Sequence, residues 1–169
     1  MKYTVVKIGR MASTNVDAYL ETVQSATPIE NGSHIVLGDL IPGGDLNTYK
    51  ALAPTDVNVD DVLIVESPVL VEVEGMRIDI RDPRKFINAK DRPLRARRLK
   101  QGDSVTISID GFTDVPTVGQ YVVPVNGSYK LAPSTTIGTS KLVYKVELKT
   151  SIPIAVEYLE AYKLKVIKS

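Results

Sequence analysis

The chain has 169 residues, the size of one ordinary domain, which is enough to bury a hydrophobic core. Its 43% hydrophobic and 24% charged residues, with a mean hydropathy of -0.01, are typical of a soluble globular protein and argue against a disordered or membrane-embedded chain. The chain contains no cysteine and one histidine, which excludes disulfides, thiolate metal sites, cysteine nucleophiles and sites built on two histidines.

The net charge of +1 conceals a strong segregation of charge along the chain. Residues 1–76 carry 4 basic and 11 acidic residues, whereas residues 77–100 carry 10 basic and 3 acidic ones. An acidic and a basic surface on one small domain suit head-to-tail or lattice contacts between protein subunits. The alternative is a solvated surface on which the opposite charges meet after folding.

Residues 1–25 are expected to form an N-terminal arm that contacts a neighbouring subunit. Residues 15–24 place their apolar side chains at helical spacing, but residues 19–23 suit an extended strand equally well, so both conformations remain open. Tyr3 and Tyr19 are the candidates for partner contact in this arm. The opening MKYTVVKIGR lacks the apolar core and cleavage site of a secretory signal, so we expect the chain to be made and folded in a cytoplasm.

Residues 26–169 are expected to form a single β-rich domain. Apolar and polar residues alternate most clearly at 104–109 and 142–149, and β-branched residues predict further strands at 3–8, 34–41, 62–65, 69–73, 120–123 and 163–167. Turn residues separate the strands at Asn31-Gly32, Pro42-Gly43-Gly44, Glu74-Gly75, Asp110-Gly111, Asn126-Gly127 and Gly138. Short strands with regular turns predict an all-β fold, a single β-barrel or sandwich-like domain.

Residues 120–131 are expected to form a hairpin around Asn126-Gly127, with Pro124 at an edge because proline cannot donate to a ladder. Residues 154–162 suit a strand or a short helix, and the β context favours the strand. The charged stretch 79–93 is the expected loop excursion from the core.

The basic segment is the strongest candidate for a functional surface. Its cations are Arg92, Arg95, Arg97, Arg98 and Lys100. On a strand, alternate members point to opposite faces, so both faces are charged, which is typical of an edge strand or a contact surface. Arginine pairs in a bidentate manner with carboxylates of a neighbouring subunit, and we prefer this interpretation. Binding of single-stranded nucleic acid is disfavoured because the block offers only Phe86 as a stacking platform.

No pattern predicts a catalytic centre. Pro42-Gly43-Gly44-Asp45 is followed by no GKS or GKT, so a plain turn is expected there in place of a phosphate loop. Asp60 and Asp61 read as the lead-in to a strand, and a lone histidine such as His34 is usually a surface or edge residue. We therefore expect a protein that is not an enzyme and that binds no metal, cofactor or small molecule.

Several motifs together resemble the head decoration, or auxiliary capsid, proteins of tailed bacteriophages. The resemblance covers the first two thirds of the chain through IENGSHIVLGDL at 29–40, TYKALAP at 48–54, VLIVESPVL at 62–70 and FINAKDRPLRARRLKQGDSVTIS at 86–108. It implies that the segment from Arg95 to Lys100 is an Arg-rich docking strand, closed by a turn at Gly102 and Asp103. The charged insertion at 76–86 departs from that pattern.

The resemblance implies a structural virion protein on the outer surface of a phage capsid, where it cements coat subunits. Its partner would be the major capsid protein, with self-association into a homo-oligomer as a further option and no membrane contact. A tail, connector or baseplate component, a nucleic-acid-binding barrel and a carboxylate enzyme remain alternatives, in that order.

Overall fold

The computed structural model of this chain describes residues 2–43, 47–73, 76–79, 82–154 and 156–169, and it confirms the predicted all-β fold. Its strands are β1 (Val6–Ile8), β2 (Leu20–Gln24), β3 (His34–Leu40), β4 (Thr48–Leu52), β5 (Leu63–Val65), β6 (Leu70–Val73), β7 (Met76–Asp79), β8 (Pro93–Arg98), β9 (Ser104–Ser108), β10 (Tyr121–Pro124), β11 (Leu131–Ser134), β12 (Val143–Ile154) and β13 (Glu157–Lys168). The helical elements in the described residues are short 3-10 turns, η1 (Ala12–Thr14), η2 (Asp17–Tyr19), η3 (Pro83–Lys85) and η4 (Ile109–Gly111).

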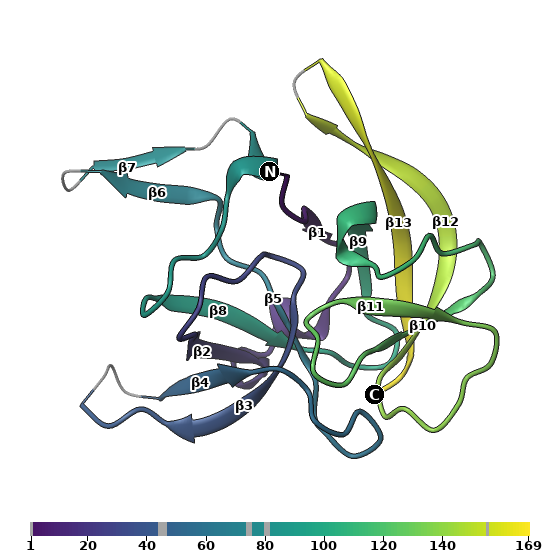
Figure 1. Cartoon of the computed structure of the whole chain (residues 1–169), viewed down its shortest axis with the longest axis horizontal. Coiled ribbons are helices and arrows are strands. Elements are labelled where there is room, and N and C mark those ends of the chain that lie inside the picture. Colours follow the sequence, from purple (N-terminus) through teal and green to yellow (C-terminus); the bar gives the residue numbers. More distant parts are fainter. Residues whose placement is uncertain (1, 44–46, 74–75, 80–81, 155) are drawn as a thin grey trace.

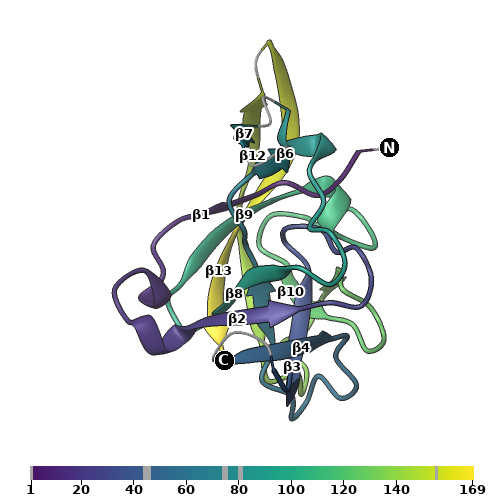
Figure 2. The same ribbon diagram turned by 90° about the vertical axis from the view of Figure 1, so that its left-hand side faces the viewer.

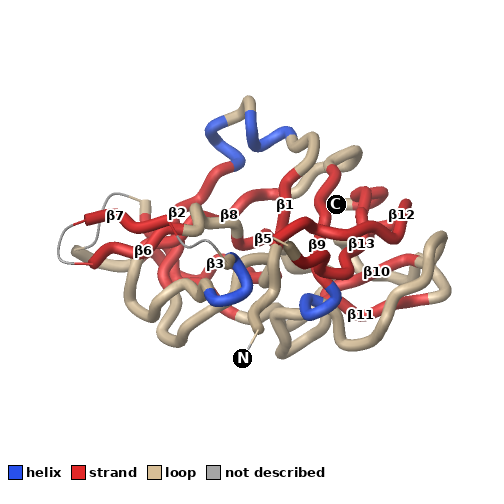
Figure 3. Tube along the Cα trace, turned by 90° about the horizontal axis from the view of Figure 1, so that it is seen from above, coloured by secondary structure: helices blue, strands red, loops and turns tan. Residues whose placement is uncertain are grey.

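The strands form two packed sheets and one separate hairpin (Figure 1). Strands β2, β4, β3, β5 and β8 close into a barrel, and a six-stranded sheet has the order β1-β9-β13-β12-β10-β11. The barrel and the sheet lie side by side when seen from above (Figure 3). Among the residues that the structure describes, β6 and β7 pair only with each other, and they stand apart from the barrel in Figure 1.

The main core lies between the barrel and one face of the six-stranded sheet. Alternating residues of the sheet such as Ile107, Tyr144 and Leu164 point inward and pack with Ile64 of barrel strand β5. A second core, which includes Ile35, fills the barrel itself. Because the inward face of the sheet is buried against the barrel, the alternate residues of the same strands form an outer face.

The single histidine joins the two sheets, and the prediction of a surface position for His34 is wrong. His34 is fully buried in β3, and its Nε2 shares a hydrogen bond of 2.7 Å with the hydroxyl of Tyr144 in β12. The two rings pack edge to face at 5.6 Å. Burial lowers the pKa of His34 to about 3, against a smaller opposing effect of the Gly32 backbone, so the imidazole is neutral near pH 7.

The expected N-terminal arm is instead part of both sheets. Strand β1 pairs with β9 at the edge of the six-stranded sheet, and β2 pairs with both β4 and β8 in the barrel. Turns η1 and η2 connect them, which resolves the open choice between helix and strand into short 3-10 turns followed by a strand. Figure 2 shows this segment crossing from the sheet to the barrel. Its long-range pairing explains the difference, because such pairing leaves no local signal in the sequence.

The C-terminal predictions hold. Strands β10 and β11 form the hairpin around Asn126-Gly127, and Pro124 lies beyond the residues of β10 that pair with β12. Residues 157–162 are strand, as favoured, and β12 and β13 form a long ribbon that projects from the body of the molecule (Figures 1 and 2). The predicted turns at Gly44 and at Glu74-Gly75 lie outside the described residues.

Candidate docking surfaces

The arginine-rich segment forms β8, one of the five strands of the closed barrel. Its register pairs Arg97 with Leu20 of β2 on one side and with Ile64 of β5 on the other. The expectation of an edge strand is therefore wrong, because closure of the barrel uses both edges of β8.

Two of these arginines are neutralised within the subunit. Arg97 is buried, and its Nε lies 2.9 Å from a carboxylate oxygen of Glu66. Arg98 pairs with Glu21 at 3.0 Å and also with Asp61. These carboxylates belong to the acidic first part of the chain, so at this position the segregated charges meet inside the fold. The guanidinium groups of Arg97 and Arg98 are already engaged and do not form a free basic surface.

The remaining predicted contact residues are scattered. Arg92 is exposed in the turn before β8. Arg95 is also exposed, and its guanidinium lies 3.9 Å from a carboxylate oxygen of Glu66. Lys100 lies over the ring of Tyr19, with Nζ 4.9 Å from the ring centroid. Tyr3 is half-buried and donates its backbone N–H to the carbonyl of Arg84. The structure therefore brings Lys100 and Tyr19 together and leaves Tyr3 and Arg92 apart from them.

The predicted turn after the arginines is present. Gly102 has a φ of +97°, a conformation that favours glycine. The buried carboxylate of Asp103 accepts backbone hydrogen bonds of 2.8 Å from Lys100 and from Ala12. Leu99, which the resemblance placed on a docking strand, is instead a core residue with 4% exposure.

The β12–β13 ribbon carries exposed apolar side chains at its tip. In the described residues, β12 beyond Leu148 and β13 before Ala161 pair only with each other. Near the turn, Val156 is 94% exposed and Tyr158 is 78% exposed. The first residue of β13 after the turn, Glu157, forms an ion pair with Arg84 of η3, and this arginine holds the pKa of the Glu157 carboxyl below its usual value.

A second surface, which the sequence analysis missed, lies on the outer face of the six-stranded sheet. Four exposed lysines there, defined as the lysine face, are Lys7, Lys145, Lys163 and Lys165. Lys145 and Lys165 are direct cross-strand partners. Lys7 and Lys163 flank the same residue of β9, Thr106, so they stand about 10 Å apart across the sheet.

A β-bulge places an apolar residue beside these lysines. The register of β12 against β13 shifts between Val146 and Leu148, so that Leu148 comes opposite Lys163 and is 53% exposed. Glu147 at the same bulge lies 3.6 Å from the Lys163 ammonium. The lysines at alternate positions of the two strands were visible in the sequence, and that alternation could have located this face.

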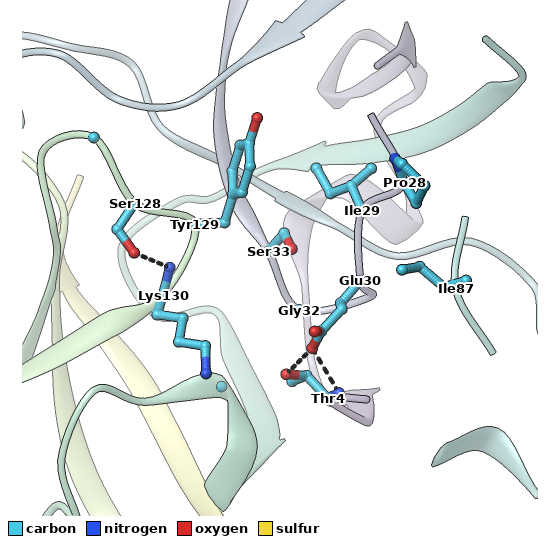
Figure 4. A pocket seen from close by; sticks show the side chains of 12 residues that line it. Thr4, Pro28, Ile29, Glu30, Gly32, Ser33, Ile87, Ser128, Tyr129 and Lys130 are labelled. Carbon is cyan, nitrogen blue, oxygen red and sulfur yellow. Dashed lines mark hydrogen bonds between the residues drawn. The ribbon is translucent and has the colours of Figure 1, made fainter. Parts of the chain in front are cut away.

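A cavity of about 300 Å³ lies between the N-terminal segment, the turn before β3 and the turn at 127–130 (Figure 4). One oxygen of the Glu30 carboxylate accepts hydrogen bonds from the backbone N–H and the hydroxyl of Thr4, at 2.8 and 2.6 Å. Ser33, Tyr129 and Lys130 also line it. Glu30 thus ties the N-terminal segment to the barrel, and the expected absence of a small-molecule ligand stays a prediction.

Within the described ranges, no three acidic or histidine side chains gather in a way that could hold a metal ion. No helix in that part of the chain has the length and apolar character to span a membrane. Comparison with protein-family models, with curated proteins and with solved structures finds no match to this chain.

Proposed function

We propose that this chain is a non-enzymatic structural subunit of a tailed-phage virion that binds the outer surface of the capsid and strengthens contacts between coat subunits. The sequence motifs that resemble head decoration proteins motivate the choice of virion and capsid. The observation that carries a docking role is the projecting β12–β13 ribbon, whose apolar tip residues Val156 and Tyr158 are almost fully exposed. Exposed apolar side chains gathered on a projection are typical of protein interaction sites.

The ribbon is built to present its tip in a fixed position. Ile152 and Ile154 of β12 pack with Val5 and Ala161 in a small core of their own. The Glu157–Arg84 ion pair fastens the strand that follows the turn. Because the ribbon is ordered before binding, little conformational entropy is lost when the tip docks. Repeated on a symmetric lattice, even modest contacts of this kind act together through avidity.

The test mixes purified protein with undecorated heads of the phage that encodes it and measures bound protein after sedimentation. Saturable binding at a fixed number of copies per head is expected. The variant Tyr158→Ser is expected to weaken binding to heads. The control variant Val59→Ser, which also replaces an exposed apolar side chain by serine, is expected to leave binding unchanged, since Val59 is 67% exposed on a different loop. Binding to tails or connectors in place of heads, or to no virion part, contradicts the proposal.

A further inference from the structure

The lysine face contains an electrostatic arrangement that the isolated subunit does not compensate. Lys145 and Lys165 stand directly opposite each other on neighbouring strands, which places their Cβ atoms about 5 Å apart. Like charges in such a pair destabilise a sheet. Among the described residues, the ion pair of Glu147 goes to Lys163, and neither Lys145 nor Lys165 has an acidic partner within 4 Å.

The face also has the composition of a protein contact. Leu148 is half exposed next to Lys163, and Tyr121 lies half-buried beside Lys145 on the adjoining strand. An apolar residue surrounded by charged ones matches the anchor and rim of a protein interface. Lys145, Lys163 and Lys165 lie on β12 and β13, two inner strands of the six-stranded sheet, so the backbone beneath these three lysines is held on both sides. Lys7 lies on the edge strand β1.

We propose that the lysine face binds an acidic protein surface, with Leu148 as its apolar anchor and with partner carboxylates between Lys145 and Lys165. This inference rests on the proposed function, because it specifies the chemistry of the coat surface to which the subunit binds. Carboxylates placed between the two ammonium groups relieve their repulsion, so the arrangement that is unfavourable in the free subunit becomes favourable in the complex. Functional surfaces commonly keep such locally unfavourable arrangements.

Nucleic acid is the less suitable polyanion for this face. The basic residues are lysines, which act as point charges, and the face lacks the exposed aromatic platforms on which bases stack. Leu148 at the edge of the lysines also has no role on a phosphate backbone, whereas it fits an apolar depression between carboxylates on a protein.

The experiment compares three proteins in binding to undecorated heads across a range of salt concentrations. The first is the wild type, and the second carries Lys145→Glu with Lys165→Glu. The third, a matched control with the same change in net charge, carries Lys50→Glu with Lys130→Glu, since both of these lysines are exposed on other elements. We expect the double change on the lysine face to weaken head binding at least about tenfold and to reverse its salt dependence, because salt screens the repulsion between the new carboxylates and an acidic partner, and we expect the control to bind as the wild type does.

A second variant separates an effect on binding from an effect of the double change on folding. Leu148→Ser alters no charge and is expected to weaken head binding severalfold, with an unchanged circular dichroism spectrum. If the lysine-face variants bind heads as tightly as the wild type, this inference is wrong and the proposed function stands. If no protein binds heads, the proposed function fails and the inference with it. If the wild type binds duplex DNA and the lysine-face double variant loses only that binding, the partner is nucleic acid and the inference is overturned.

Discussion

Lowering the pH from 7 to 5 is expected to reduce the free energy of unfolding by about 2 kcal/mol through His34 alone. Its pKa is about 3 in the folded protein, where burial disfavours the cation, against 6.5 for an unperturbed histidine. Between these values the unfolded chain holds a proton that the folded chain does not. The stabilisation is therefore complete above pH 6.5 and is lost as the pH falls towards 3, where the total loss reaches about 5 kcal/mol.

The pH window isolates this group because His34 is the single histidine of the chain. The carboxyls of Asp60 and Glu157 have their pKa held below the usual value by hydrogen bonds from the backbone of Asp56 and from the side chain of Arg84. Their contributions are present above the unfolded pKa of a carboxyl and are lost only as the pH falls below it. They therefore change little between pH 7 and 5.

The assay is urea unfolding at pH 7, 6 and 5, followed by circular dichroism, for the wild type and for His34→Gln. Glutamine keeps an amide that can bond the Tyr144 hydroxyl but has no titrating group. The variant is expected to be less stable at pH 7 and to show almost no change between pH 7 and 5. A wild-type stability that is flat over this range refutes the assigned burial of His34, as does a glutamine variant that retains the full slope.

Two further predictions concern the charged residues. Replacing Arg97 by Met leaves Glu66 without its buried cation and is expected to cost about 3 kcal/mol in urea unfolding, whereas Arg92→Met at an exposed turn costs less than about 0.5 kcal/mol; equal effects would show that the Arg97 pair is not structural. Lys165→Glu turns the repulsive pair with Lys145 into an attractive one and is expected to stabilise the free subunit by about 0.2–1 kcal/mol. Thermal unfolding measures this gain, and a loss of stability would contradict the assigned register.

Local patterns predicted the strands and not their assembly. Alternation located β9 and the first part of β12, and Asn126-Gly127 located the β10–β11 hairpin, because side-chain period and turn chemistry act over a few residues. The closure of a barrel by β2 and β8 depends on contacts between residues that lie from 69 to 77 positions apart. The same distance in sequence concealed the arm's place in both sheets.

The candidate surfaces followed the same rule. The density of basic residues made β8 the predicted contact surface. The carboxylates that neutralise its arginines lie 31 to 77 residues away, so the sequence could not reveal the pairing. The lysine face has no charge run, since its members alternate with core residues on three strands. His34 looked like an edge residue because its partner, Tyr144, lies 110 positions later in the chain.

The interlaced topology also limits how the protein can be made and divided. Strand β8 fills the gap between β2 and β5, so a nascent chain that ends before residue 93 holds four barrel strands with two open edges and most of the acidic side chains. The pairing of β1 is delayed further during synthesis, because its partner β9 is made almost a hundred residues later. A split before residue 93 separates β8 from the other barrel strands and β1 from β9, so the two fragments are expected to regain structure only when mixed.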